Sequence, residues 1–134
     1  PNGICFAEGS HDGYRGVSAD HRRRLEVLEA LPTRITLRVV DTLTLRQPMR
    51  FRCWWHLAPG LAPETLEQLW LEAPTADALQ ASWHDTWLAQ GFGHRAPRNS
   101  RCFQGLLPAG QHQLHTVLSL PAPAALTTAC LASG

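Results

Sequence analysis

Residues Ser10–Leu43 read SHDGYRGVSADHRRRLEVLEALPTRITLRVVDTL, and this stretch decides the fold. In its second half, Arg34–Asp41, apolar and polar side chains alternate, which is typical of a strand with one buried face. Arg24–Leu28 alternates in the same way, and Leu31–Thr33, with its proline, separates the two runs. Two alternating runs with a turn between them predict an antiparallel pair of strands.

A helix is the alternative for the first of these runs. Leu25, Leu28 and Leu31 lie at helical spacing, and Glu26 and Glu29 are good helix formers. An apolar run this short does not decide between the two by its pattern, and we favour the strand.

Downstream, Met49–Leu57 is rich in aromatic residues and is followed by Pro59-Gly60, which predicts a further strand. Two registers are open for it: either Phe51, Cys53 and Trp55 face inward, or Trp54 does.

Later in the chain, Cys102–Leu107 and Gln113–Leu120 also have the pattern of strands, and they flank a turn at Pro108–Gly110. Turn residues recur roughly every ten positions, as in all-β sandwiches. The sequence therefore predicts an all-β fold, an antiparallel β-sandwich over residues 1–120, with a loosely ordered tail over residues 121–134.

Residues 62–91 have two interpretations. Pro63-Glu64-Thr65 could begin a helix that continues through Leu66, Leu69 and Trp70. Alternation also fits two strands, one through Leu69 and Leu71 and one through Leu79, Ala81 and Trp83, around a break at Ala73–Thr75. We leave helix against strand open here.

Composition restricts the class of protein. The chain has 134 residues, 44% hydrophobic and 17% charged, which suits one globular domain. A net charge of +1 gives no overall positive electrostatic field that would attract a nucleic acid. The basic run Arg22–Arg24 is expected to be solvated. No apolar run approaches the ~20 residues of a membrane helix, and Pro1–Gly3 does not begin a signal peptide. The first residue is not methionine, so we expect a piece of a longer protein.

Cysteines and histidines predict no metal site and no cofactor. Cys5, Cys53, Cys102 and Cys130 are scattered without a CxxC pair, so free thiols are favoured over two disulfides. His112 and His115 are three apart in a predicted strand, so their side chains should point to opposite faces.

The five tryptophans also have two interpretations. They could form a platform on which sugars stack, or most of them could fill the core of the sandwich, which we favour. They are Trp54, Trp55, Trp70, Trp83 and Trp87.

Several segments, in order, carry a resemblance to a known family. They are SHDGYRGVSADHRRRLEV, ITLRVVDTL, FRCWWHLAPG, LAQGFGHRAP and HTVLSL. This succession, from Phe6 to Leu120, resembles the C-terminal part of the heparinase II/III-like polysaccharide lyases, in which H-D-G-Y, V-x-H-R-R, V-V-D and aromatic-x-H-L-x-P-G motifs follow one another.

The resemblance implies a parent enzyme of bacterial type, with an N-terminal α-helical toroid and a C-terminal β-sandwich. It would degrade a uronate-containing acidic polysaccharide, a glycosaminoglycan or alginate, by β-elimination in the periplasm or outside the cell. In the family, the catalytic residues lie on the toroid and on strands upstream of the H-D-G-Y turn. No catalytic residue is therefore assigned here, and we expect the chain alone to be inactive. The alternative is a non-catalytic carbohydrate-binding or structural sandwich.

The H-D-G-Y turn holds the candidate substrate-binding residues, His11, Tyr14 and Arg15, whose side chains suit an anionic sugar. Asp12-Gly13 is a strong turn dipeptide, because Gly adopts positive φ without steric cost. We favour a structural turn between an early strand, Ile4–Glu8, and the strand that begins near His21.

Overall fold

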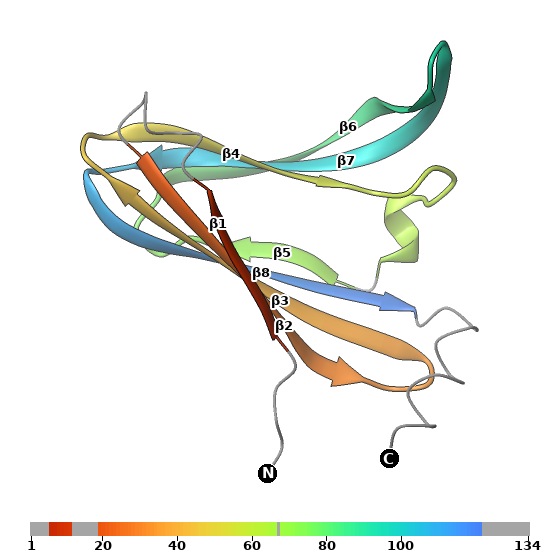
Figure 1. The fold of residues 1–134 in the computed structure, drawn as a ribbon, viewed down its shortest axis with the longest axis horizontal. Coiled ribbons are helices and arrows are strands. Elements are labelled where there is room, and N and C mark those ends of the chain that lie inside the picture. The colour runs from red at the N-terminus through yellow and green to blue at the C-terminus, as the bar shows by residue number, and fades with distance from the viewer. Residues whose placement is uncertain (1–5, 12–18, 67, 122–134) are drawn as a thin grey trace.

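The computed structural model describes residues 6–11, 19–66 and 68–121. Eight strands and one short 3-10 helix follow one another: β1 (Phe6–His11), β2 (Ala19–Ala30), β3 (Arg34–Leu45), β4 (Met49–His56), η2 (Pro63–Thr65), β5 (Gln68–Glu72), β6 (Asp77–Gly91), β7 (His94–Leu107) and β8 (Gly110–Pro121). The strands form two layers, a five-stranded sheet ordered β1-β2-β3-β8-β5 and a three-stranded sheet ordered β4-β7-β6 (Figure 1). Every neighbouring pair is antiparallel, which confirms the predicted β-sandwich.

The pair predicted from the first stretch is β2 and β3. Both are strands of twelve residues, so the strand interpretation is confirmed and the helical one is wrong. Two backbone hydrogen bonds between Leu31 and Arg34, of 2.8 and 3.2 Å, close the turn. A β-bulge between Val27 and Glu29 then shifts the register by one residue.

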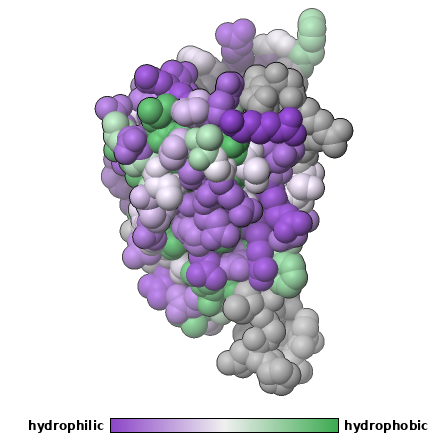
Figure 2. All heavy atoms as spheres, turned by 90° about the vertical axis from the view of Figure 1, so that its left-hand side faces the viewer, coloured by the Kyte–Doolittle hydropathy of each residue, from purple (hydrophilic) through white to green (hydrophobic). Residues whose placement is uncertain are grey.

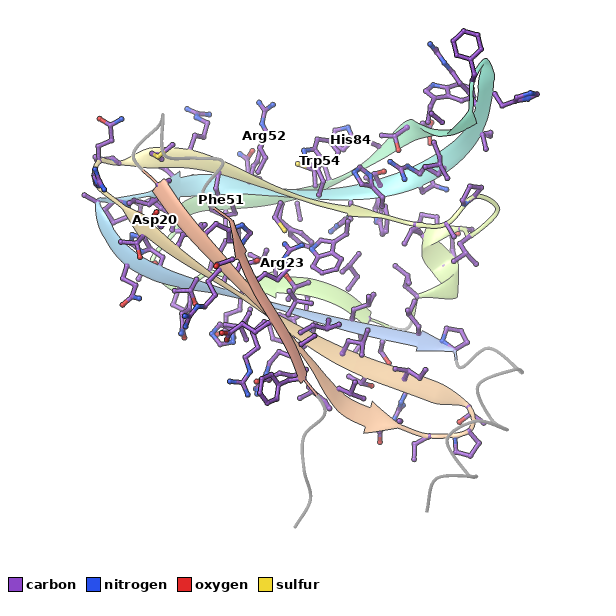
Figure 3. The ribbon with its side chains drawn as sticks, viewed as in Figure 1. Asp20, Arg23, Phe51, Arg52, Trp54 and His84 are labelled. Atoms are coloured by element: carbon purple, nitrogen blue, oxygen red, sulfur yellow. The ribbon has the colours of Figure 1, made fainter. Side chains whose placement is uncertain are left out.

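The predicted aromatic strand is β4, and its first register is confirmed. Cys53 is buried and Phe51 and Trp55 are half-buried, whereas Trp54 is 39% exposed. Phe51 thus lies between the sheets (Figure 3).

The central segment follows the strand interpretation. Only Pro63–Thr65 is helical, as a single 3-10 turn, and β5 and β6 lie on either side of the break at Ala73–Thr75. Strand β6 has 15 residues and pairs along its length with β7. Their two-residue loop ends with Gly93 at φ +77°, a conformation that glycine adopts without strain.

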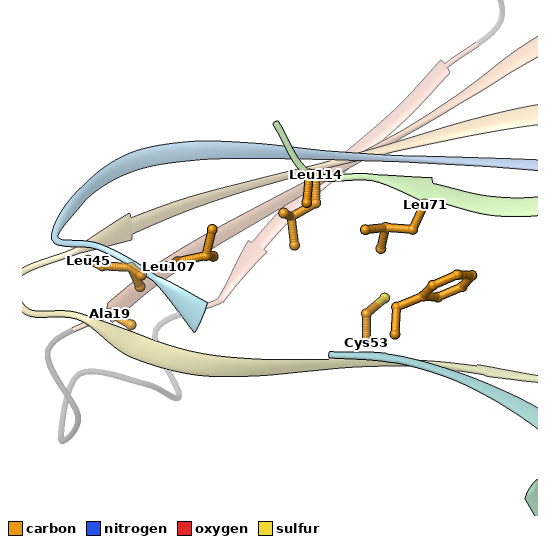
Figure 4. Close-up of a cluster of buried hydrophobic side chains, with 8 residues drawn as sticks. Ala19, Leu45, Cys53, Leu71, Leu107 and Leu114 are labelled. Atoms are coloured by element: carbon orange, nitrogen blue, oxygen red, sulfur yellow. The ribbon is translucent and has the colours of Figure 1, made fainter. Parts of the chain in front are cut away.

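Side chains from both sheets build the core. Leu107 and Phe103 of the three-stranded sheet meet Leu114 and Leu71 of the five-stranded sheet, and Cys53 belongs to the same cluster (Figure 4). Leu107 is fully buried and Leu114 is 2% exposed. One apolar layer between two sheets is the usual arrangement of a sandwich.

The expectation that most tryptophans fill this core is wrong. Trp54, Trp70 and Trp87 are 39%, 44% and 63% exposed, and Trp55 and Trp83 are only half-buried. The physical reason is their position: Trp54 and Trp70 project from the outward faces of the sheets, and Trp87 lies near the end of the β6–β7 hairpin.

Hydrophilic side chains predominate at the end of the sandwich where the β3–β4 and β7–β8 turns lie, and hydrophobic ones form small separate patches (Figure 2). Within the described ranges, no helix is long and apolar enough to cross a membrane. The predicted tail lies outside the described residues apart from Pro121, which ends β8.

Candidate functional site

A groove opens between the two sheets beside the edge strands β1 and β4. Its volume is about 850 Å³. One wall is formed by residues of β1, β2 and β3 and the other by residues 49–54 of β4. Most lining residues are apolar, with a few charged groups among them, which is the usual character of a small-molecule site.

A charged cluster lies on the inner wall of this groove. Asp41 of β3 is 3% exposed, and it accepts hydrogen bonds from Arg23 Nε at 2.7 Å and Arg23 Nη2 at 2.9 Å. The Nε2 atom of His21 lies 2.7 Å from Asp41 Oδ1. A buried carboxylate is costly unless it is paired in this way. Arg23 and His21 therefore compensate the burial of Asp41.

The register of β2 and β3 brings these residues together. Arg23 pairs directly with Asp41, and His21 pairs with Leu43 two residues further along β3. On β2, His21 and Arg23 lie on the same face as the inward-facing Leu25, and Asp41 lies directly opposite Arg23 on β3. All three side chains therefore point between the sheets, where Figure 3 shows Arg23. The hydrogen bond to Asp41 is the main cause of a raised pKa for Arg23.

Across the groove, β4 presents an aromatic ring and a thiol to this cluster. The Arg23 guanidinium lies 5.5 Å from the Trp55 ring centroid, within cation–π range. Burial, followed by the negative charge of Asp41, raises the pKa of Cys53 from 9.0 to about 11. Cys53 is therefore a neutral thiol at neutral pH and does not act as a nucleophile or metal ligand there.

The cluster can position a cation and a histidine beside an anionic ligand. A guanidinium has five N–H donors, and Asp41 accepts from two of the Arg23 nitrogens. The Arg23 side chain is 48% exposed and that of His21 is 17% exposed, so both reach the groove. Arg50 and Arg52 of the edge strand β4 also border the groove, but their side chains lie on the outward face of the sheet, as Figure 3 shows for Arg52.

The predicted site residues lie mostly outside the described part of the chain. His11 ends β1, and its backbone pairs with His21. Tyr14 and Arg15 fall in the segment 12–18, outside the described residues, so their predicted role stays a prediction. The strands flanking this segment, β1 and β2, are antiparallel neighbours, as expected for strands joined by a turn.

Sequence reasoning missed His21, Arg23 and Asp41. The sequence held a signal for two of them. In ADHRRRLEV, His21 and Arg23 fall on the same face of an alternating strand as Leu25, which predicts that they face the core. We interpreted the arginine run as solvated. Arg22 has 64% of its side chain exposed and Arg23 has 48%, but Arg23 also pairs with the buried Asp41, which the solvated interpretation did not include.

The histidines give no metal centre among residues 6–11, 19–66 and 68–121, where no group of three His, Cys, Asp or Glu side chains is placed to hold an ion. His112 is buried, with its Nδ1 atom 2.8 Å from Thr75 Oγ1 and its Nε2 atom 2.8 Å from the Pro108 carbonyl oxygen. The odd spacing along β8 places His115 on the opposite face.

The chain matches the model of a known protein family. A family model described as heparinase II/III-like, C-terminal, matches residues 1–117. No curated protein and no solved structure matches the chain.

Proposed function

Because the chain belongs to the heparinase II/III-like C-terminal family, we propose that it is the C-terminal β-sandwich of a polysaccharide lyase. The parent enzyme would cleave a uronate-containing acidic polysaccharide by β-elimination. The observation that carries this proposal is the family match over residues 1–117, which covers every strand except the end of β8.

The chemistry of β-elimination requires three groups around one sugar. A base removes the proton beside the uronate carboxylate, a cation or hydrogen-bond donor stabilises the enolate, and an acid protonates the leaving oxygen. The groove offers the second of these, because Arg23 is a cation beside a cavity of saccharide size.

The base and the acid would come from elsewhere in the parent chain. Arg23 and His21 are both bound to Asp41, so the cluster is better suited to holding charge in a fixed position than to transferring a proton. The only tyrosine in the sequence is Tyr14, outside the described residues. In this proposal, the sandwich supports an N-terminal α-helical toroid and forms one wall of the sugar cleft.

The proposal is tested by following unsaturated uronate products, which absorb in the ultraviolet. The parent enzyme should release them from at least one polymer among heparin, heparan sulfate, hyaluronan and alginate. The 134-residue chain alone should release none, because in this proposal the base and the acid belong to other parts of the parent chain. Steady product formation by the chain alone would overturn its supporting role, and an inactive parent on all four polymers would overturn the lyase assignment.

A further inference from the structure

The outward face of the three-stranded sheet carries aromatic and polar side chains in register. Cys102 of β7 lies between Trp54 of β4 and Ser82 of β6, and the neighbouring rows add further groups. Figure 3 shows Arg52, Trp54 and His84 pointing away from the five-stranded sheet, on the side opposite Phe51 and Arg23. We call this surface the tryptophan–histidine face; it consists of Arg52, Trp54, His56, Gln80, Ser82, His84 and Gln104.

Three rings form the centre of the face. The Trp54 and His84 ring centroids are 5.1 Å apart and tilted by 58°, and those of Trp54 and His56 are 6.2 Å apart and nearly parallel, at 10°. Cys102 is only 3% exposed although it lies on this outward side, so its neighbours cover it. Trp54 itself remains 39% exposed and presents an indole surface to solvent.

Hydrogen bonds hold these side chains in place. His56 Nδ1 lies 2.7 Å from Ser100 Oγ, which in turn lies 2.5 Å from Thr86 Oγ1. Ser82 Oγ lies 2.8 Å from His84 Nε2. A ring surface that is already ordered loses little conformational entropy when a ligand binds.

The outward faces of the two sheets differ in whether their arginines are paired with carboxylates. On the five-stranded sheet, Glu26 lies 2.9 Å from Arg24 and 2.6 Å from Arg38, so both of these arginines are paired with a carboxylate of the same sheet. On the tryptophan–histidine face, no carboxylate of the described residues lies within ion-pair distance of Arg52. Arg52 pairs with Gln104, in the row next but one to Trp54 and Cys102, so its side chain lies on the same face as the rings. Its positive charge also opposes the rise in the pKa of Cys102 that burial causes.

We propose that the tryptophan–histidine face binds an anionic saccharide, with a pyranose ring against Trp54 and a carboxylate or sulfate group on Arg52. Axial C–H groups of a pyranose match the face of an indole, and a guanidinium donates paired hydrogen bonds to a carboxylate or sulfate. Gln80 and Gln104, which hydrogen-bond each other at 3.1 Å beside Arg52, supply amide groups for sugar hydroxyls. The face lies on the outward side of the sheet, although Arg52 and Trp54 also border the groove where β4 forms the edge of the sheet. The proposal goes beyond the lyase assignment.

Binding to the 134-residue chain is measured by calorimetry, without any need for lyase activity. Oligogalacturonate and alginate oligosaccharides probe the carboxylate, heparin oligosaccharides probe the sulfate, and cellohexaose is the neutral control. Trp54→Ala should weaken binding of the preferred anionic oligosaccharide by about tenfold or more, and Arg52→Gln should remove most of the preference over cellohexaose.

Matched controls are available on the same sheet. Trp87→Ala removes a more exposed tryptophan near the β6–β7 hairpin, and Arg95→Gln removes an exposed arginine at the start of β7. Both should leave the affinity within about twofold of wild type. Far-ultraviolet circular dichroism checks that each variant is folded.

The proposal is overturned if the wild-type chain binds none of the anionic oligosaccharides, or if Trp54→Ala and Trp87→Ala affect the affinity equally. It is also overturned if single-stranded DNA binds through Trp54 more tightly than any saccharide, because the face would then be a nucleic-acid site.

Discussion

At the scale of single residues, Asp41 is the group on which the groove cluster depends. It is buried at 3% exposure and has two cationic or ionisable partners, Arg23 and His21. Asp41→Asn keeps the shape of the side chain but removes the charge. We expect it to lower the free energy of unfolding by about 1–3 kcal/mol, as for a lost charge-assisted hydrogen bond. The loss should stay below that of a fully buried ion pair, because Arg23 is half-exposed and regains hydration.

Urea denaturation of the two proteins measures this difference. Asp20→Asn is the matched control, because Asp20 is an exposed aspartate of the neighbouring strand β2, next to His21. It should change the free energy of unfolding by less than about 0.5 kcal/mol. Equal effects of the two substitutions would show that the cluster contributes nothing to stability.

Cys53 and Cys102 give a prediction about thiol chemistry. Both are free and buried, burial raises the pKa of Cys102, and it raises that of Cys53 to about 11. Because the thiolate is the reactive form, an aromatic disulfide reagent at pH 8 should modify neither of them in the folded chain. After denaturation without reductant, the same reagent should report all four cysteines as thiols.

A count below four would reveal a disulfide and contradict the prediction. The pH dependence has a definite sign. Folding favours the neutral Cys53 thiol, so its contribution to stability is complete below pH 9 and is lost as the pH rises toward 11. A chain whose stability increased over that range would contradict the direction of the shift.

At the scale of elements, the close pairing of β7 with β4 depends on Gly105, which lies opposite Phe51. A Cβ atom there would lie 2.9 Å from Phe51 Cε1 and 3.3 Å from the Asp77 carbonyl oxygen. Phe51 can move only partly, because it packs on the core, so Gly105→Ala should lower the free energy of unfolding by about 1–3 kcal/mol. Gly91→Ala is the control, since nothing lies within 4 Å of its added Cβ. Thermal unfolding of both variants decides the matter, and equal melting temperatures would contradict this view of the contact.

The strands themselves were largely predictable, because each buries one face. Alternation identified β3 and β4, and it favoured the correct state for β2. For residues 62–91 the same pattern left helix and strand open, because the two periods overlap in short apolar runs. The tryptophans were misplaced because an alternating pattern does not show which face of a strand points inward, and Trp54 and Trp70 lie on the outward faces of the two sheets.

The groove cluster was harder to predict, and a β-bulge explains why. Counted back from the turn, where Ala30 pairs with Ile35, Asp41 would pair with Arg24. The bulge between Val27 and Glu29 shifts the register, so that Asp41 pairs with Arg23 instead. A shift of one residue reverses which face a side chain joins. Without the bulge, Asp41 would not share a face with Arg23 and His21.

At the scale of the whole molecule, the two sheets share one core and expose two chemically different surfaces. The core cluster takes residues from β2, β3, β5 and β8 on one side and from β4 and β7 on the other. Between the edge strands, this layer opens into the charged groove, and on the far side of the three-stranded sheet lies the tryptophan–histidine face. The molecule therefore offers two separate places for anionic groups, and only one of them lies between the sheets.

A shared core predicts that both sheets unfold together. Leu107 of β7 is fully buried in it, whereas the adjacent Leu106 is 43% exposed on the outward side. Leu107→Ala should lower the free energy of unfolding by about 2–5 kcal/mol, through lost burial and a residual cavity, and Leu106→Ala by less than about 1 kcal/mol.

Two spectroscopic signals test whether the sheets unfold together. Far-ultraviolet circular dichroism follows all strands, and tryptophan fluorescence chiefly follows the three-stranded sheet, which holds four of the five tryptophans. The two signals should change at the same urea concentration in each protein, and both midpoints should fall together in Leu107→Ala. Midpoints that separate would mean that each sheet is stable without the other and that Leu107 does not join them.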